Sequence, residues 1–271
     1  MHDEFSSRYS GTAIPGQSLK GKVAIVSGSS SGIGAAIAYE LSSRGALVVV
    51  NYPHAKFQSE ARTIVDSFPS LGTAIEADLS TTTGPSDLVN KTVHLFNKVD
   101  ILVNNAAIAV NLPFEEQTLE HWESLINLNG RGTFLLTQAV LPHLLKKEDG
   151  GGGRIVNIVS CSSRGPPPGQ TIYAGTKGMV DSFTRCWAKE LPQKYGCTVN
   201  SVSPGPTRTP GFEDAGPEAM KLLQPIINQT PCGPRMGEAD EVAFAVGFLC
   251  EERSRWVNGT HLSVTGGLYI D

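Results

Sequence analysis

The stretch from Lys22 to Arg44 restricts the possible folds of this chain more than any other part of the sequence. The run K-V-A-I-V-S that begins at Lys22 is short and β-branched, which is typical of a fully buried strand. A turn of sequence G-S-S-S-G-I-G follows and leads into the helical run A-A-I-A-Y-E-L-S-S-R. Glycines there let the backbone turn sharply and approach a pyrophosphate, whose charge then lies at the helix N-terminus. The alternative is an ordinary strand–helix turn. We expect cofactor contacts at Gly28, Ser30, Ser31, Ile33 and Gly34.

Strand and helix patterns alternate along the rest of the chain. Buried strand patterns occur at residues 46–52, 73–77, 99–105, 154–159, 197–202 and 261–265, and helical patterns at about 56–68, 85–98, 172–191 and 238–250. This alternation predicts an α/β fold, a single doubly wound Rossmann domain with one parallel sheet, helices on both faces and ligands at the carboxyl ends of the strands. We expect residues 1–20 to form a flexible arm and 21–271 the domain. Residues 206–229, with a helical piece at about 217–229, are expected to form a substrate lid.

Composition excludes several kinds of partner. A net charge of −4 and a pI near 5.9 provide no basic surface for nucleic acid or an anionic membrane. No apolar run approaches the roughly 20 residues that span a bilayer, and the polar start has no signal-peptide pattern. The 5 cysteines are scattered without a C-x-x-C motif, which indicates a reduced, cytoplasmic protein. The histidines and cysteines form no zinc-binding pattern, so we expect no metal.

The end of the second strand bears on cofactor choice. An Asp or Glu there bonds the ribose 2′-hydroxyl of NAD, but this chain has Asn51. A neutral amide does not repel a 2′-phosphate, and His54 and Lys56 lie close enough in sequence to supply positive charge. These features favour NADP(H) over NAD(H). The alternative for His54 and Lys56 is a solvated helix start.

Polar residues also follow the next strands. The carboxylate of Asp78, followed by Leu79, is suited to accept a hydrogen bond from the adenine amine, or to act as an N-cap for the next helix. Asn104 and Asn105 are suited to tie strand ends together, while Ala106 leaves room for a ribose. A later asparagine, Asn129, falls in the middle of a helical stretch, where Asn is disfavoured unless its side chain has a task or the helix kinks.

The chemistry is expected between Ser160 and Lys177. Tyr173 and Lys177 are one helical turn apart, so both side chains project from the same helix face. A free Tyr has a pKa of about 10, and a nearby ammonium lowers it when water is excluded. Ser160, at the end of a buried strand, offers a hydroxyl to the same substrate oxygen. The alternative for the Tyr–Lys pair is an ordinary surface pair.

Together these residues resemble the short-chain dehydrogenase/reductase family over essentially all of residues 21–271. The matching motifs are S-G-S-S-S-G-I-G, Asp78, N-N-A-A, Asn129, Ser160, Tyr173 with Lys177, P-G-P-T-R-T and T-G-G. The resemblance implies that Tyr173 is the general acid, that Lys177 lowers its pKa and holds the nicotinamide ribose, that Ser160 binds the substrate oxygen, and that Asn129 anchors a water. It further implies that Pro204, Thr207 and Thr209 lie against the carboxamide.

The family pattern has local departures, since Ser27 stands where Thr is usual and Ala107 where Gly is usual. V-V-V-N-Y looks like the NADPH-using ketone reductases of the polyketide and naphthol type. The implied activity is hydride transfer between NADP(H) and a small-molecule ketone or secondary alcohol, in a homo-oligomer, often a tetramer. An isomerase or cyclase on the same fold, and a non-catalytic dinucleotide sensor, are the alternatives.

Overall fold

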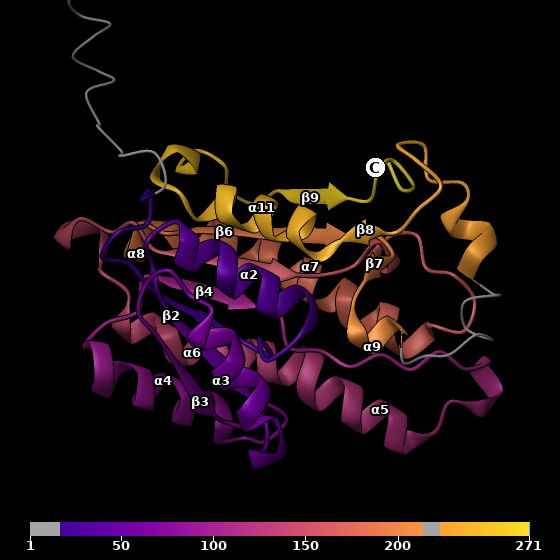
Figure 1. Cartoon of the computed structure of the whole chain (residues 1–271), viewed down its shortest axis with the longest axis horizontal. Helices are drawn as coiled ribbons and strands as arrows, with labels where there is room; N and C mark the ends of the chain where they lie inside the picture. The colour runs from indigo at the N-terminus through magenta and orange to yellow at the C-terminus, as the bar shows by residue number, and fades with distance from the viewer. Residues whose placement is uncertain (1–16, 214–222, 271) are drawn as a thin grey trace, which may run out of the picture.

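The computed structural model describes residues 17–213 and 223–270, and its centre is a seven-stranded sheet in the order β3-β2-β1-β4-β5-β6-β9 (Figure 1). Every neighbouring pair in that sheet is parallel. The predicted α/β class and doubly wound topology are therefore confirmed. The strands are β1 (Val23–Val26), β2 (Leu47–Tyr52), β3 (Gly72–Glu76), β4 (Ile101–Asn104), β5 (Arg154–Ile158), β6 (Thr198–Pro204) and β9 (His261–Val264).

Helices cover both faces of the sheet because the strand side chains alternate between two apolar clusters. Ala24 and Val26 of β1 face the cluster covered by α2, α3 and α11, whereas Ile25 faces the cluster on the opposite side. In Figure 1, α2 lies beside α11, with which it makes extensive contact. The longer helices are α2 (Gly32–Ser43), α3 (Gln58–Asp66), α4 (Gly84–Phe96), α5 (Leu119–Leu125), α6 (Thr133–Val140), α7 (Thr171–Glu190) and α11 (Ala239–Cys250).

One predicted helix is interrupted. The stretch around Asn129 was expected to be helical with a kink or a task for the amide, and the structure has a π-helix at Ile126–Gly132 between α5 and α6. Asn129 is buried within it, and its amide bonds the backbone of Ile108 and the hydroxyl of Thr176. The side chain therefore has a task, since its amide bonds residues outside the helix at the place where the winding changes.

The boundary of the N-terminal arm is corrected. Residues 1–16 lie outside the described ranges, but Leu19, expected to belong to a flexible arm, is 1% exposed and packs in the core against α2 and α11. Its N–H donates to the Arg44 carbonyl, and Ser18 Oγ donates to Glu251. The folded domain therefore includes residues before Gly21, because burial of Leu19 outweighs the polar composition around it.

The expected lid is described only at its two ends, because residues 214–222, which include the first part of the predicted 217–229 helix, lie outside the described ranges. On the near side, β7 (Thr207–Arg208) pairs with β8 (Gly237–Glu238), and α9 (Pro210–Glu213) follows β7. On the far side, residues 223–227 are helical. The start of the segment is thus joined by a short parallel pair to residues that follow its end.

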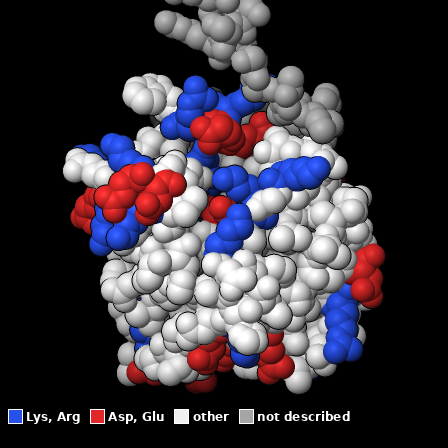
Figure 2. All heavy atoms as spheres, turned by 90° about the vertical axis from the view of Figure 1, so that its left-hand side faces the viewer, with Lys and Arg blue, Asp and Glu red and all other residues white. Residues whose placement is uncertain are grey.

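Charge is mixed over the surface in view in Figure 2, where Lys and Arg side chains lie next to Asp and Glu side chains. This distribution agrees with the small net charge of −4. Within residues 17–213 and 223–270, no helix has both the length and the apolar character needed to cross a bilayer.

Candidate active site

A cavity of about 1110 Å³ lies at the carboxyl ends of the strands, where β1 has β2 on one side and β4 on the other. In an open α/β sheet, this reversal of strand order is where ligands bind. Of the residues predicted from the sequence, Asn129 is the one that does not line the cavity. Those that do are Gly28, Ser30, Ser31, Ile33, Gly34, Asn51, His54, Lys56, Asp78, Leu79, Asn105, Ala106, Ser160, Tyr173, Lys177, Pro204, Thr207 and Thr209.

Close packing explains two of the glycines in the turn between β1 and α2. Gly28 has φ +58°, and a Cβ there would lie 2.8 Å from the Cα of Ala106. A Cβ on Gly34 would lie 2.4 Å from the Gly28 carbonyl oxygen and 2.5 Å from the Asn105 amide nitrogen. Any side chain at either position would push the turn away from the end of β4. The turn therefore keeps its shape only with glycine at both places.

The start of α2 fits a pyrophosphate. The first N–H groups of a helix have no acceptor within the helix, and they carry its positive dipole end. Ser31, at the N-cap, makes no side-chain capping bond, and the first turn of α2 contains no acidic residue. Ser31, Gly32 and Ile33 line the cavity, so these donors are available to an anion there.

Asn51 lines the cavity, but it is 2% exposed and its side chain bonds the backbone. Its Oδ1 accepts from Gly28 N at 3.0 Å, and its Nδ2 donates to the Ala77 carbonyl at 3.0 Å. Asn51 therefore braces the glycine turn. An Asp at this position would still accept from Gly28 N, but its second carboxylate oxygen would face the Ala77 carbonyl oxygen and repel it. The structure therefore favours a neutral amide at position 51.

Lys56 and His54 lie at the edge of the cavity beside Asp78. Lys56 is exposed, with its Nζ 4.8 Å from the centre of the Phe57 ring. His54 Nε2 lies 3.9 Å from Asp78 Oδ2. Asp78 Oδ1 accepts from the backbone and hydroxyl of Ser80, whereas the N-cap of α4 is Thr83. The alternative of Asp78 as the N-cap of α4 is therefore wrong, and one of its oxygens still faces His54.

The end of β5 and helix α7 bring together the three residues expected to carry the chemistry, Ser160, Tyr173 and Lys177. Ser160 follows β5, and its Oγ accepts a hydrogen bond from Ser162 N at 3.1 Å. Tyr173 and Lys177 lie on α7, whose first turn begins at Thr171. The Nζ of Lys177 donates to the Ile158 carbonyl at 2.8 Å, so the ammonium sits at the end of β5. The sequence prediction that these side chains meet in one cavity agrees with the structure.

The direction of the Tyr173 pKa differs from the expectation. Burial raises the pKa of the Tyr173 phenol, while a hydrogen bond with the Ser160 side chain acts in the opposite direction. Burial lowers the pKa of the Lys177 ammonium to about 8. Lys177 Nζ is 5.8 Å from the centre of the Tyr173 ring and is bonded to a carbonyl, so it does not lower the phenol pKa in this arrangement. At neutral pH, Tyr173 therefore keeps its proton.

A buried carboxylate fixes the loop that follows Ser160. Asp181, one turn beyond Lys177 on α7, bonds Arg164 from that loop, Arg185 from its own helix and His261 Nδ1 from β9. Burial raises the pKa of this carboxyl, but the hydrogen bond and charge of His261 and the two guanidinium groups outweigh it and hold the pKa well below its usual range. The anion thus joins three segments of the chain.

Several cavity residues were not predicted from the sequence as part of the site. Cys161 is buried, and it also lines the cavity. Burial raises the pKa of its thiol, which leaves it protonated at neutral pH. The wall beyond Tyr173 is completed by Asn111, Ser162, Gln170, Leu223, Ile226 and Tyr269. Gln170 could have been predicted as a cavity residue from its position just before the helix that carries Tyr173. Nothing in the sequence around the loop residue Asn111 predicts that it lines the cavity.

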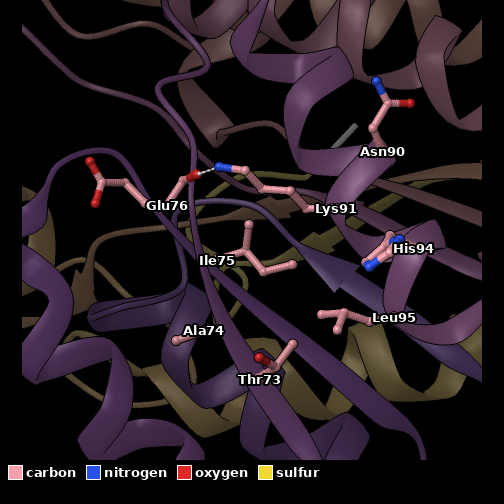
Figure 3. A pocket seen from close by; sticks show the side chains of 8 residues that line it. All are labelled: Thr73, Ala74, Ile75, Glu76, Asn90, Lys91, His94 and Leu95. Carbon is pink, nitrogen blue, oxygen red and sulfur yellow. Dashed lines mark hydrogen bonds between the residues drawn. The ribbon is translucent and has the colours of Figure 1, made fainter.

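A second hollow lies elsewhere on the molecule, between β3 and α4 (Figure 3). Lys91 crosses it and donates from Nζ to the Glu76 carbonyl at 2.9 Å. It contains none of the residues predicted to bind cofactor or substrate. The candidate site is therefore the cavity at the carboxyl ends of the strands.

Known proteins match this chain over nearly its whole length. A family model described as Enoyl-(Acyl carrier protein) reductase matches residues 28–269. The short-chain dehydrogenase/reductase FrzI of Cladobotryum sp is 38% identical over 260 residues, covering 94% of this chain and 98% of that protein. The hydroxynaphthalene reductase arp2 of Aspergillus fumigatus is 33% identical, with 90% and 91% covered. A short chain dehydrogenase from Burkholderia cenocepacia J2315, solved in complex with NADP, has a TM-score of 0.83 at 33% identity, with 92% and 98% covered.

A doubly wound sheet that brings Ser160, Tyr173 and Lys177 into one cavity with the glycine turn before α2 fits a nucleotide-dependent dehydrogenase. Because the matches extend over nearly the whole chain, the protein belongs to the short-chain dehydrogenase/reductase family. It is an NAD(P)H-dependent oxidoreductase that acts on a carbonyl group or the corresponding alcohol. The isomerase and sensor alternatives are not favoured by relatives named as reductases and dehydrogenases.

Burial of Lys177 predicts a specific pH dependence of stability. Its pKa is about 8 in the folded protein against 10.5 for the free group, so the unfolded chain binds this proton more tightly. The cost to folding is fully present below pH 8 and disappears as the pH rises through about 10.5, a change of about 3 kcal/mol. Urea unfolding of wild type and Lys177→Met across this range should show the wild type gaining stability relative to the variant.

Other groups titrate in the same range, so the comparison is made as a difference between two proteins. Lys189→Met provides the matched control, because Lys189 is an exposed lysine on the same helix. The difference in the free energy of unfolding between Lys189→Met and wild type should not change with pH. If the difference in the free energy of unfolding between Lys177→Met and wild type were also independent of pH, the buried environment of Lys177 would be contradicted.

Proposed function

We propose that this protein is an NADPH-dependent reductase of a small or polyketide-like ketone, in which Tyr173 protonates the carbonyl oxygen. The observation that carries the proposal is the position of the Tyr173 phenol, which lies with Ser160 and Lys177 in the cavity that also contains the turn at the start of α2. A phenol that retains its proton at neutral pH is the form that a proton donor requires. The five cysteines without a disulfide support action in a reducing, cytoplasmic compartment.

The substrate carbonyl would lie between Ser160 and Tyr173. NADPH, when bound, supplies the hydride that adds to the carbonyl carbon. Negative charge then develops on the carbonyl oxygen, where the Ser160 hydroxyl donates a hydrogen bond and Tyr173 transfers its proton. Both donors are fixed by the fold, Ser160 at the end of β5 and Tyr173 in the first turn of α7, so little reorganisation accompanies the reaction.

Lys177 and Asn129 have supporting roles in this proposal. Lys177, whose Nζ lies at the end of β5, would hold the nicotinamide ribose. Asn129 uses both amide hydrogens on Ile108 and Thr176, so its side chain positions the loop after β4. That Asn129 anchors a water stays a prediction.

Tyr173→Phe tests the proton donor. The substitution keeps the ring and removes the transferable proton, so kcat should fall by at least about 100-fold while NADPH binding stays within a few-fold. Steady-state ketone reduction and NADPH fluorescence titration measure the two effects. Tyr39→Phe, at an exposed tyrosine on α2, is the control and should keep wild-type activity. A Tyr173→Phe enzyme with more than a tenth of wild-type kcat would disprove the assignment.

The preference for NADPH is supported by the groups at the adenosine end of the cavity. Asn51 supplies no carboxylate to repel a 2′-phosphate, and Lys56 and His54 line the cavity beside it. An exposed lysine that contacts the phosphate contributes less than a buried one because water screens it. The NADP complex of the Burkholderia cenocepacia relative adds support by analogy.

We expect kcat/KM with NADPH to exceed that with NADH by at least about tenfold, from one charge-assisted contact. Lys56→Ala should reduce this ratio several-fold by raising KM for NADPH while leaving KM for NADH unchanged. Lys146→Ala, an exposed lysine outside the cavity, should leave the ratio as it is. Equal or better use of NADH by the wild type would reject the proposed cofactor.

A homo-oligomer, often a tetramer in the family, is also proposed. Phe134 of α6 is 41% exposed and joins Phe183 and Trp187 of α7 in a cluster on the outer face of these helices. Light scattering at micromolar concentration should give a multiple of the 28.8 kDa chain mass, and Phe134→Glu should shift the protein toward the monomer. A wild-type monomer would contradict the proposal.

A further inference from the structure

The helix that carries Tyr173 begins in an unusual way. Gln170 occupies the N-cap of α7, a position that favours Ser, Thr, Asp or Asn, and its side chain makes no capping bond. The cap comes instead from Gln117, whose Oε1 accepts from Ile172 N at 3.2 Å. The same Gln117 donates from Nε2 to the carbonyls of Leu112 and Gly169. A distant residue thus caps the helix, and the Gln170 side chain is left for another purpose.

That side chain connects two other cavity residues. Ser162 Oγ donates to Gln170 Oε1 at 2.7 Å, and Gln170 Nε2 donates to Asn111 Oδ1 at 2.8 Å. All three residues line the cavity that holds Tyr173. The hydrogen bonds run in one direction, from Ser162 through Gln170 to Asn111. The Asn111 Nδ2 group consequently remains a donor at one end, and the lone pairs of Ser162 Oγ remain an acceptor at the other.

Two loops hold this chain of hydrogen bonds in place. The loop after β4 and the segment before α7 are joined by Leu112 N to the Gly169 carbonyl at 3.0 Å, besides the bonds of Gln117. Gly169 has φ +86°, a conformation that lets the segment turn toward Leu112. The wall is therefore fixed before substrate arrives, which is what discrimination between substrates requires.

We propose that Ser162, Gln170 and Asn111 recognise a second oxygen atom on the substrate. The preferred substrates are then ketones that also carry a hydroxyl or a second carbonyl group. This inference rests on the proposed ketone reduction and specifies the substrate class for the same site. The three side chains are neutral, and they offer one donor end and one acceptor end. A hydroxyl group can use either end, whereas a second carbonyl can use only the donor at Asn111.

The test compares matched ketones with NADPH as the reductant. Cyclohexanone and tetralone are each paired with partners that carry a hydroxyl or a second carbonyl on the ring, at several positions. For at least one pair, the wild type should show a kcat/KM at least about fivefold higher for the oxygen-bearing partner. Gln170→Met, which keeps the side-chain length without polar atoms, should reduce that ratio to about twofold or less, mainly through KM.

Asn111→Asp tests the donor end of the hydrogen-bond chain separately. Asn111 is an exposed loop residue, so we expect the substitution to leave the fold intact. The carboxylate still accepts from Gln170 Nε2, but the donor toward the cavity is lost. This variant should lose the preference for the second carbonyl and keep a preference for the hydroxyl. Gln193→Met, at an exposed glutamine of α8 (Pro192–Tyr195) outside the cavity, is the control and should match the wild type.

The outcomes separate the two proposals. Reduction of the simple ketones with no preference for any oxygen-bearing partner would overturn this inference and leave the proposed function standing. A preference that survives in Gln170→Met, or a preference for the second carbonyl that survives in Asn111→Asp, would also overturn it. If the wild type oxidised NADPH with none of the ketones, the proposed function would fail and this inference would fail with it.

Discussion

The turn between β1 and α2 depends on hydrogen bonds supplied by the two neighbouring strands. The Asn105 amide donates to the carbonyls of Ser27 and Gly28, and Ser27 Oγ accepts from the backbone of Asn105 and Ala106. From the other side, Asn51 accepts from Gly28 N. These bonds satisfy backbone groups that a sharp turn would otherwise leave unpaired in a buried place. They also set the position of the α2 N-terminus relative to β4, and with it the geometry of the cofactor side of the cavity.

A second set of bonds links the loop after β4 to the helix that carries the proton donor. Asn129 bonds both the N–H and the carbonyl of Ile108, and its Nδ2 also reaches Thr176 Oγ1, which in turn donates to the Tyr173 carbonyl. The π-helix turns the Asn129 side chain out of its own helix toward these partners. The two sides of the cavity are therefore aligned by amide side chains from two strand ends and one irregular helix.

The fold and the cavity residues were predictable because they depend on local patterns. Alternating strands and helices predict the sheet, and polar residues at strand ends predict which side chains meet there. The partners of those side chains were not predictable. Asn51 turns toward Ala77 and Gly28 because a buried amide must satisfy its own hydrogen bonds, and Lys177 turns to the Ile158 carbonyl for the same reason. Leu19 was misassigned because a polar neighbourhood hides a single residue that packs against distant helices.

The carboxylate of Asp181 has a consequence for how this chain tolerates sequence change. Arg164, Arg185 and His261 come from a loop, a helix and the last strand of the sheet, and each directs a nitrogen at the same two oxygens. Losing one of the three donors leaves the carboxylate with other partners, whereas losing Asp181 leaves three basic side chains crowded around a vacated centre. Arg164, Arg185 and His261 can therefore be substituted one at a time. Asp181 can change only together with these three residues, so it limits how far the loop after Ser160 can diverge in sequence.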